Sequence, residues 1–268
     1  MSENNLETKA NHLKNELKKL NNFVVAYSGG TDSTFLAVMA KEAVGSTNFV
    51  AVTAKAPIFS ELELTESSNL AKDFAINHHV FNVNVLDYES FVENPPNRCY
   101  YCKKVIAMEI NKIAQEYGYS YVMDGTNHDD VSRDIRPGVK AAKEMNILSP
   151  LKDVGLTKEE IRKLSRSKNI PNWNKPSNAC LASRIPYGST ITTNKLSKIE
   201  TAENILKEAG IDQVRARCHD EILRIEVPVE NFEKILTDKD HIVYKLKELG
   251  FKYITLDLEG YRSGSMNN

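Results

Sequence analysis

The chain has 268 residues, of which 41% are hydrophobic and 26% charged, with a formal net charge of -1. This length allows one large or two modest domains with a good core, and the near-neutral charge offers no electrostatic reason to expect a general nucleic-acid or membrane partner. The polar residues 1–5 indicate no signal peptide, and no run approaches the about 18 apolar residues that span a bilayer, so we expect a cytoplasmic protein.

The first half of the chain alternates between strand-like and helix-like segments. An amphipathic helix over 6–21 precedes the first strand. Four strands are expected at about 23–27, 48–54, 79–85 and 120–123. Helices are expected between them at about 34–44, 61–77 and 103–117. This alternation predicts an α/β fold with a doubly wound parallel sheet. Ligands then collect at the carboxyl ends of the strands, where Ala54 and Gly125 would lie.

A phosphate-binding loop is predicted directly after the first strand. Its glycines allow the backbone to approach a phosphate, and the helix that follows presents free N–H groups and the positive end of its dipole. The Gly-x4-Gly-Lys spacing of a Walker A loop is absent. A plain Gly-Gly turn before a capped helix is the alternative, which the full motif after a strand disfavours. The residues concerned are Ser28, Gly29, Gly30, Thr31, Asp32 and Ser33.

Carboxylates near this loop suggest a magnesium site, because Mg²⁺ binds through few carboxylates together with phosphate oxygens. Asp32 is the first candidate. Asp129 or Asp130 is a weaker candidate, since an exposed acidic pair is most often a solvated loop. Arg136 follows in the same connection and is a further candidate for the nucleotide site.

Four cysteines in a chain that we expect to be cytoplasmic indicate thiols for metal binding or chemistry rather than disulfides. Cys99 and Cys102 form a Cys-x-x-Cys at a loop–helix junction, which suits a redox pair, half a zinc site or two ligands of an iron–sulfur cluster. Cys180 lies in a loop expected near the strand ends. Three convergent thiols would leave one iron of a four-iron cluster open to sulfide. The alternative is a pair of unliganded thiols near the surface, and Cys218 is expected to be a buried thiol.

The pattern changes in the second half. Thr157 and Glu160 form a capping box that opens a helix to about Ser167, and a Pro- and Asn-rich loop follows over 170–180. A smaller α+β domain is predicted over 189–268, after a first domain over 1–188. Its elements are a helix at about 194–209, strands at 213–217 and 222–227, a helix at 229–249 and a strand at 252–258.

Arg215 and Arg217 alternate on one face of a predicted strand. They would either form a fork for a carboxylate or phosphate, or cover a solvated strand face.

The chain resembles the LarE family, ATP-dependent sulfur transferases of the PP-loop superfamily. The motifs that carry the resemblance are Ser28–Ser33, Asp124–Asn127, Arg136–Gly138, Ala179–Arg184 and Val214–Arg217. The resemblance implies that the enzyme adenylates a carboxylate of pyridinium-3,5-biscarboxylic acid mononucleotide and releases pyrophosphate. Sulfur then converts the carboxylate to a thiocarboxylate, for biosynthesis of the nickel-pincer nucleotide.

The resemblance also implies cofactors and site residues. Family members with cysteines matching Cys99 and Cys102 are thought to hold a [4Fe-4S] cluster together with the cysteine matching Cys180. ATP and Mg²⁺ are the other expected cofactors. Ser183, Arg215 and Arg217 match substrate- or phosphate-site residues. The acidic residues associated with metal binding are Glu203 and Glu226. The expected partners are a carboxylate nucleotide, sulfide or another sulfur donor, and further copies of the chain in a trimer or hexamer.

Three competing functions remain open. A tRNA thiolase joins a PP-loop to a cluster but needs a broad basic surface, against which the charge of -1 argues. An amide-forming PP-loop synthetase would use ammonia and no cluster. A protein that senses ATP without turnover would release no pyrophosphate.

Overall fold

The computed structural model describes residues 3–132, 137–176, 179–262 and 264–266. The chain divides into two compact units. The first comprises Met1–Val85 with Asn97–Asn178, and the second comprises Leu86–Pro96 with Ala179–Asn268.

The first unit is built on a four-stranded parallel sheet. Its strands are β1 (Phe23–Ala26), β2 (Phe49–Lys55), β3 (His78–Asn82) and β4 (Tyr121–Met123). They lie in the order β3-β2-β1-β4, so the first strand occupies a central position. The runs of Val, Ala and Phe in β1 and β2 are buried, as expected for strands covered on both faces. The predicted α/β fold is confirmed.

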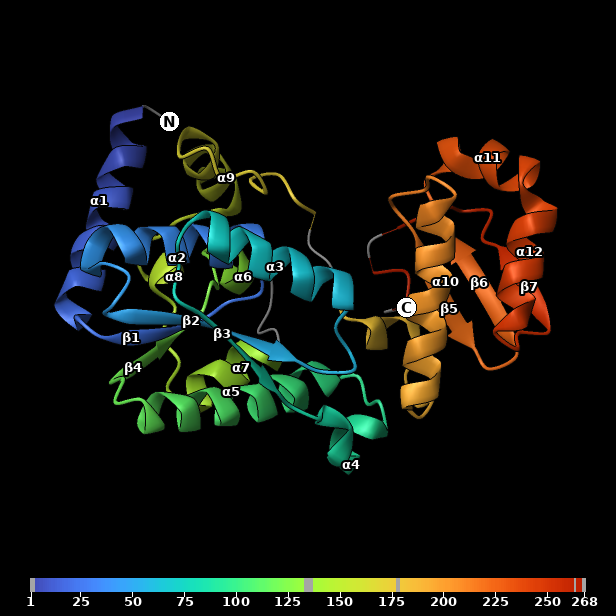
Figure 1. The fold of residues 1–268 in the computed structure, drawn as a ribbon, viewed down its shortest axis with the longest axis horizontal. Helices are drawn as coiled ribbons and strands as arrows, with labels where there is room; N and C mark the ends of the chain where they lie inside the picture. The colour runs from blue at the N-terminus through green and yellow to red at the C-terminus, as the bar shows by residue number, and fades with distance from the viewer. Residues whose placement is uncertain (1–2, 133–136, 177–178, 263, 267–268) are drawn as a thin grey trace. The chain divides into compact units, whose positions relative to one another are not determined.

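Helices cover both faces of this sheet, with α2 and α3 on one side and α5 and α7 on the other (Figure 1). Apolar side chains of the helices and strands pack together in a buried core that includes Phe23, Phe35 and Phe49. The helices of the unit are α1 (Glu3–Leu20), α2 (Thr31–Val44), α3 (Glu61–Asp73), α5 (Arg98–Glu116), α6 (Asp129–Ser132), α7 (Pro137–Glu144), α8 (Pro150–Asp153) and α9 (Lys158–Ser167).

Three helix boundaries bear on the predictions. The capping box at the start of α9 is confirmed, since the Thr157 side chain accepts from the Glu160 amide and the Glu160 carboxylate accepts from the Thr157 amide. Helix α5 begins earlier than the predicted 103, so Cys99 and Cys102 lie within its first turns. Helix α3 ends earlier than the predicted 77, because the chain turns through a positive φ of 47° at Ala75 before entering β3.

The second unit contains a three-stranded sheet in the order β5-β6-β7 (Figure 1). Strands β5 (Arg215–His219) and β6 (Ile222–Glu226) are antiparallel, and β7 (Tyr253–Leu256) runs parallel to β6. The remaining elements are α4 (Glu89–Val92), the 3-10 turns η1 (Val85–Asp87), η2 (Leu181–Arg184) and η3 (Val229–Asn231), and helices α10 (Thr193–Glu208), α11 (Phe232–Thr237) and α12 (Lys239–Glu248). The single helix predicted over 229–249 is wrong, because the chain leaves helical geometry at Asp238, with φ -100° and ψ 17°.

The residues of β5 and β6 divide between two faces. Ala216, Cys218, Leu223 and Ile225 are buried apolar residues, and α10 packs against β5. Burial raises the pKa of the Cys218 thiol, which fits the predicted buried cysteine. Since side chains alternate along a strand, the arginines of β5 and β6 share the opposite face.

The second unit begins earlier than the predicted residue 189 and recruits the segment Leu86–Pro96. Asn94 explains this recruitment, because its fully buried side-chain amide donates to the carbonyls of Ile185, Pro186 and Ser189. Within the parts of the chain that the structure describes, no helix has the length and apolarity needed to cross a bilayer.

Candidate functional site

The loop between β1 and α2 leaves the start of α2 open. Gly30 is the N-cap of the helix, with φ -77° and ψ 165°, and as a glycine it provides no side-chain cap. The first N–H groups of α2 are therefore available to an anion, and the dipole of a 14-residue helix favours negative charge there. This is the geometry that the sequence motif predicts.

Two glycines let other elements approach this loop closely. Gly29 has a φ of +68°, and a Cβ on it would lie 2.5 Å from Cβ of Ser67 in α3. Gly125, which follows β4, lies against the loop from another direction, since its Cβ would be 2.9 Å from the backbone N of Ser33. The structure therefore brings the predicted Gly125 against the predicted phosphate loop.

The hydroxyl groups of the loop are bonded to one another. Ser33 Oγ lies 3.1 Å from Ser28 Oγ and accepts from the Ser28 amide at 3.2 Å. The Thr31 hydroxyl instead donates to the carbonyl of Asn172, at 2.8 Å. Ser28 and Ser33 thus form a small hydroxyl pair at the mouth of the loop, while Thr31 anchors the loop to its surroundings.

Of the two carboxylate oxygens of Asp32, one accepts a hydrogen bond and the other does not. Its Oδ2 accepts from Lys158 Nζ at 2.6 Å, whereas Oδ1 is buried without a hydrogen-bond partner among the described residues. Burial raises the pKa of Asp32, and the ammonium group of Lys158 opposes that rise. A buried carboxylate oxygen beside a phosphate loop fits a Mg²⁺ ligand, because such an oxygen is costly unless it is bound.

Asp129 lies beside the same lysine, in the first turn of α6. Its Oδ2 accepts from the backbone amide of Lys158 at 2.8 Å, so it holds the start of α9. The neighbouring Asp130 accepts from the amide of Asn127 at 3.1 Å. Both carboxylates therefore accept hydrogen bonds from the backbone and are not bound by solvent alone.

Asp124, at the end of β4, forms a second lysine–carboxylate pair, in which the carboxylate is buried and the lysine is partly exposed. Its carboxylate accepts from Lys103 Nζ at 2.6 Å and from the Ser149 hydroxyl at 2.9 Å. Burial acts to raise the pKa of Asp124, but Lys103 and Thr126 outweigh it and the pKa is lowered. Ala54 lies near the carboxyl end of β2, where a parallel sheet places its ligands.

The four cysteines form no disulfide. Cys99 is exposed and Cys102 partly buried, and residues three apart on a helix share a face. Two thiols on one face of a helix fit two ligands of one metal centre. Cys180 belongs to the second unit, immediately before η2.

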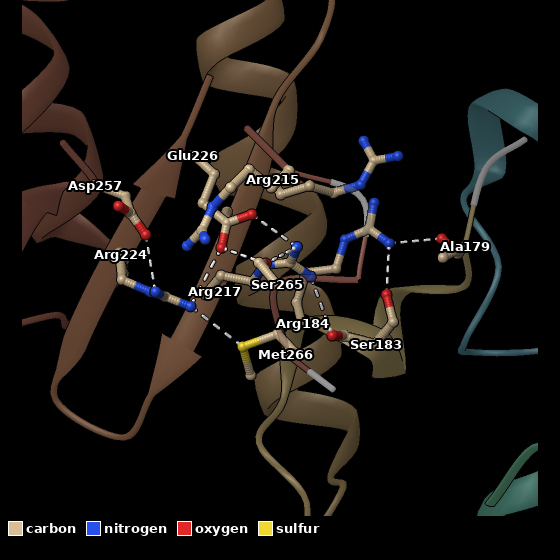
Figure 2. Close-up of polar contacts among 12 residues, drawn as sticks. Ala179, Ser183, Arg184, Arg215, Arg217, Arg224, Glu226, Asp257, Ser265 and Met266 are labelled. Atoms are coloured by element: carbon tan, nitrogen blue, oxygen red, sulfur yellow. Dashed lines mark hydrogen bonds and ion pairs between the residues drawn. The ribbon is translucent and has the colours of Figure 1, made fainter. Parts of the chain in front are cut away.

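An arginine cluster dominates the polar side of the second unit (Figure 2). Arg184 forms a bidentate ion pair with Glu203, with bonds of 2.8 and 3.1 Å, and also donates to the Ser183 hydroxyl at 2.9 Å. It donates to the Ala179 carbonyl at 2.6 Å. Arg184 therefore fixes the turn that carries the predicted residues Cys180 and Ser183.

Arg217 and Arg224 share the fully buried carboxylate of Glu226 (Figure 2), at 2.7 and 3.2 Å. Arg217 also donates to the Ser183 carbonyl, and Arg224 forms a second ion pair with Asp257 at 2.8 Å. The solvated-face alternative is wrong, since Arg215 and Arg217 are only 8% and 5% exposed.

Arg215 differs from these arginines because it forms no ion pair with a carboxylate among the described residues. Its guanidinium stacks over the Tyr261 ring, 5.4 Å from the centroid, and donates to the carbonyl of Val214. Burial lowers the pKa of Arg215, and the charge of Arg184 lowers it further. A buried cation of this kind favours an anionic ligand.

Glu203 and Glu226 are both engaged with arginines, and Glu203 also accepts from the backbone amide of Ala216. Within the described ranges, no group of three or more His, Cys, Asp or Glu side chains surrounds a common metal position. Arg136 lies outside the described residues.

Sequence reasoning missed several residues of the site. Lys158, Lys103 and Asn172 contact it from segments distant in sequence, and no local motif marks them. Two of these residues had a weak signal in the sequence. Lys158 begins a helix with a capping box, and Lys103 directly follows Cys102.

The sequence is similar to those of several known proteins. The family model described as NAD synthase matches residues 5–100, which contain the phosphate loop. An uncharacterized protein of Synechocystis is 40% identical over 264 residues, with 98% of each chain covered. An uncharacterized protein of Methanocaldococcus jannaschii is 34% identical over 254 residues, covering 94% of this chain and 96% of the relative.

A third relative has a named activity. The pyridinium-3,5-bisthiocarboxylic acid mononucleotide synthase of Lactiplantibacillus plantarum is 36% identical over 263 residues, which cover 98% of this chain and 95% of the synthase. Similarity of this extent includes both units. The chain therefore belongs to the family of the pyridinium-3,5-bisthiocarboxylic acid mononucleotide synthase, the LarE family of PP-loop proteins.

Proposed function

We propose that this protein is an ATP-dependent sulfur transferase that converts a carboxylate of pyridinium-3,5-biscarboxylic acid mononucleotide into a thiocarboxylate. The open start of α2 with the buried free oxygen of Asp32 supports adenylation chemistry. The acceptor is inferred from the name of the full-length relative.

The first step is adenylation. A carboxylate oxygen of the acceptor attacks the α-phosphorus of ATP, the bond to the bridging oxygen breaks, and pyrophosphate leaves with the electron pair. The N–H groups at the start of α2 and the hydroxyls of Ser28 and Ser33 stabilise the charge that builds on the leaving group. Asp32 would hold the Mg²⁺ that neutralises the phosphates, and Asp129 is a second candidate for it.

Arg215 and Arg217 would hold the acceptor by its anionic groups, with Ser183 beside them. Arg215 supports this role most strongly, because its charge has no carboxylate partner among the described residues. In the second step, sulfide attacks the acyl carbon of the adenylate and AMP leaves, which yields the thiocarboxylate.

Cys99, Cys102 and Cys180 would hold a [4Fe-4S] cluster, in which the iron without a protein ligand would bind sulfide. The donor chemistry supports this assignment through the pair on α5. Metal roles for Glu203 and Glu226 would require these carboxylates to leave their arginines. We further propose a cytoplasmic homo-oligomer, a trimer or hexamer, which light scattering coupled to size exclusion would test.

The NAD synthase match raises amide formation as a second candidate, but it covers only residues 5–100 and thus supports the loop chemistry rather than a product. Anaerobic incubation with ATP, Mg²⁺, the acceptor and either sulfide or ammonia separates the two. Pyrophosphate release with sulfur in the acceptor supports the proposal. Nitrogen incorporation with ammonia contradicts it.

A further inference from the structure

Asn172, from a segment far along the chain, bonds to two residues of the phosphate loop and to Thr34, which directly follows the loop. Its side-chain Nδ2 donates to the Gly29 carbonyl at 2.8 Å and to the Thr34 hydroxyl at 3.1 Å. Its own carbonyl accepts from the Thr31 hydroxyl at 2.8 Å. The two partners Gly29 and Thr31 flank Gly30, the N-cap of α2.

The bond to Gly29 fixes the orientation of one particular peptide group. The Gly29 carbonyl and the Gly30 N–H belong to the same planar trans peptide, so they point in opposite directions. While Asn172 holds the carbonyl, the Gly30 N–H is turned away from Asn172. There it donates weakly to Ser28 Oγ, at 3.4 Å, on the hydroxyl-lined side of the loop.

A Gly-Gly peptide has little intrinsic resistance to a flip. Rotation of the peptide plane changes ψ of the first residue and φ of the second, and glycine tolerates the positive φ that results. A flipped peptide would present a carbonyl oxygen instead of an N–H to a phosphate, which repels it.

We infer that Asn172 is a positioning residue for ATP, which acts by keeping the Gly30 N–H directed at the polyphosphate. The inference rests on the proposed function only for the binding of ATP at this loop. A chain that binds ATP but makes no thiocarboxylate would refute the proposed acceptor chemistry and leave the role of Asn172 open to the same test.

The first experiment compares Asn172→Leu and Asn172→Asp with wild type by calorimetric titration with ATP and MgCl₂. Both variants lose the amide donor; Asn172→Leu adds no charge, whereas Asn172→Asp adds a negative one. In both, the ATP dissociation constant should rise about tenfold. Asn174→Leu, at an exposed position of the same loop, is the matched control and should bind ATP like wild type. Unchanged ATP affinity in both Asn172 variants would overturn the inference.

The second experiment separates peptide orientation from general support of the fold. Alanine accepts the φ of -77° at Gly30, with its Cβ 3.3 Å from the Ser28 hydroxyl, which must give way slightly, but it resists the positive φ of the flipped peptide. In a Gly30→Ala background, Asn172→Leu should therefore weaken ATP binding by less than about threefold, well below its effect in wild type. An undiminished loss in that background would mean that Asn172 does not act through this peptide.

Glycine-selective ¹⁵N labelling gives a direct readout that does not depend on nucleotide binding. The amide resonance of Gly30 should shift in Asn172→Leu, while that of Gly250, which belongs to the second unit, stays in place. An unmoved Gly30 resonance would overturn the inference even if ATP affinity fell.

Discussion

Lys158 Nζ lies 2.6 Å from Asp32 Oδ2, although the two residues are 126 positions apart in the chain. The bond joins the start of α9 to the first turn of α2 and leaves Asp32 Oδ1 facing no donor among the described residues. This free oxygen is the one to which the proposed Mg²⁺ would bind.

We therefore predict that Asp32→Ala abolishes pyrophosphate release while the chain stays folded. The substitution removes the proposed Mg²⁺ ligand and the positioning of the phosphates, and it takes away an unsatisfied buried oxygen. A coupled assay for pyrophosphate and a thermal unfolding curve check both parts. Asp153→Ala, at an exposed acid on α8, is the control and should be fully active. Normal pyrophosphate release by Asp32→Ala would remove the loop carboxylate from the mechanism.

Gly125→Ala should weaken ATP binding, because the added Cβ would lie 2.9 Å from the Ser33 backbone N and push the start of α2 aside. A loss of about tenfold in affinity corresponds to about 1.4 kcal/mol. Gly138→Ala provides the comparison, since its nearest neighbour would be the flexible Lys103 side chain at 3.8 Å. Equal ATP affinities for the two variants would show that the close approach of Gly125 is irrelevant to binding.

The arginines should affect the acceptor rather than ATP, and they should differ from each other in stability. Arg215→Ala removes a charge-assisted contact worth about 1.5–3 kcal/mol, so the dissociation constant of the acceptor should rise at least about tenfold. It should cost less stability than Arg217→Ala, because Arg215 has no carboxylate partner among the described residues and its removal leaves no buried carboxylate unpaired. Arg217→Ala should lose acceptor binding and also destabilise the chain, because it leaves Glu226 with one arginine fewer.

Calorimetry with acceptor and with ATP, together with urea unfolding, tests this contrast. If both variants weakened ATP alone, the arginines would belong to the nucleotide site.

Lys103→Met should destabilise the chain in a pH-dependent way. Breaking a fully buried pair costs about 3–5 kcal/mol, and the cost here is smaller because Lys103 is 37% exposed. The lowered pKa of Asp124 makes its contribution to stability complete above the unfolded value of about 3.9 and lost as the pH falls through the folded pKa. The difference in unfolding free energy between wild type and variant should thus be full near pH 7 and shrink below about pH 4.

Urea unfolding across this pH range measures the difference. Lys112→Met on the same helix removes an exposed pair with Glu109 and should change stability by at most about 1 kcal/mol. A pH-independent difference for Lys103→Met would mean that Asp124 is not its electrostatic partner.

Local pattern was sufficient to predict the parts of the fold where one segment determines its own structure. The apolar run of β1 followed by Gly29 and Gly30 specifies a strand, a turn and an open helix start without help from elsewhere. The capping box at Thr157 is equally local. The break at Asp238 was missed because the apolar period continues across it, so only the packing of α11 and α12 distinguishes two helices from one.

Only those residues of the site that belong to a sequence motif could be predicted. Asp32 and Gly125 stand in recognisable sequences, but Lys158 and Asn172 reach the loop through the tertiary fold from otherwise ordinary segments. For Arg215 and Arg217, alternation on a strand could not decide between solvent and burial. Burial was decided by residues on other elements: Glu226 pairs with Arg217, and the Tyr261 ring packs against the Arg215 guanidinium.

The most direct test of sulfur transfer is mass spectrometry of acceptor and protein after anaerobic turnover with ATP, Mg²⁺ and isotopically labelled sulfide. Because Cys180 is proposed as a cluster ligand beside Cys99 and Cys102, we predict several labelled thiocarboxylates per chain and an unchanged mass at Cys180. The iron content should fall in Cys99→Ala, Cys102→Ala and Cys180→Ala but not in Cys218→Ala. Dehydroalanine at position 180, with no more than one unlabelled thiocarboxylate per chain and full activity in Cys99→Ala, would contradict the account.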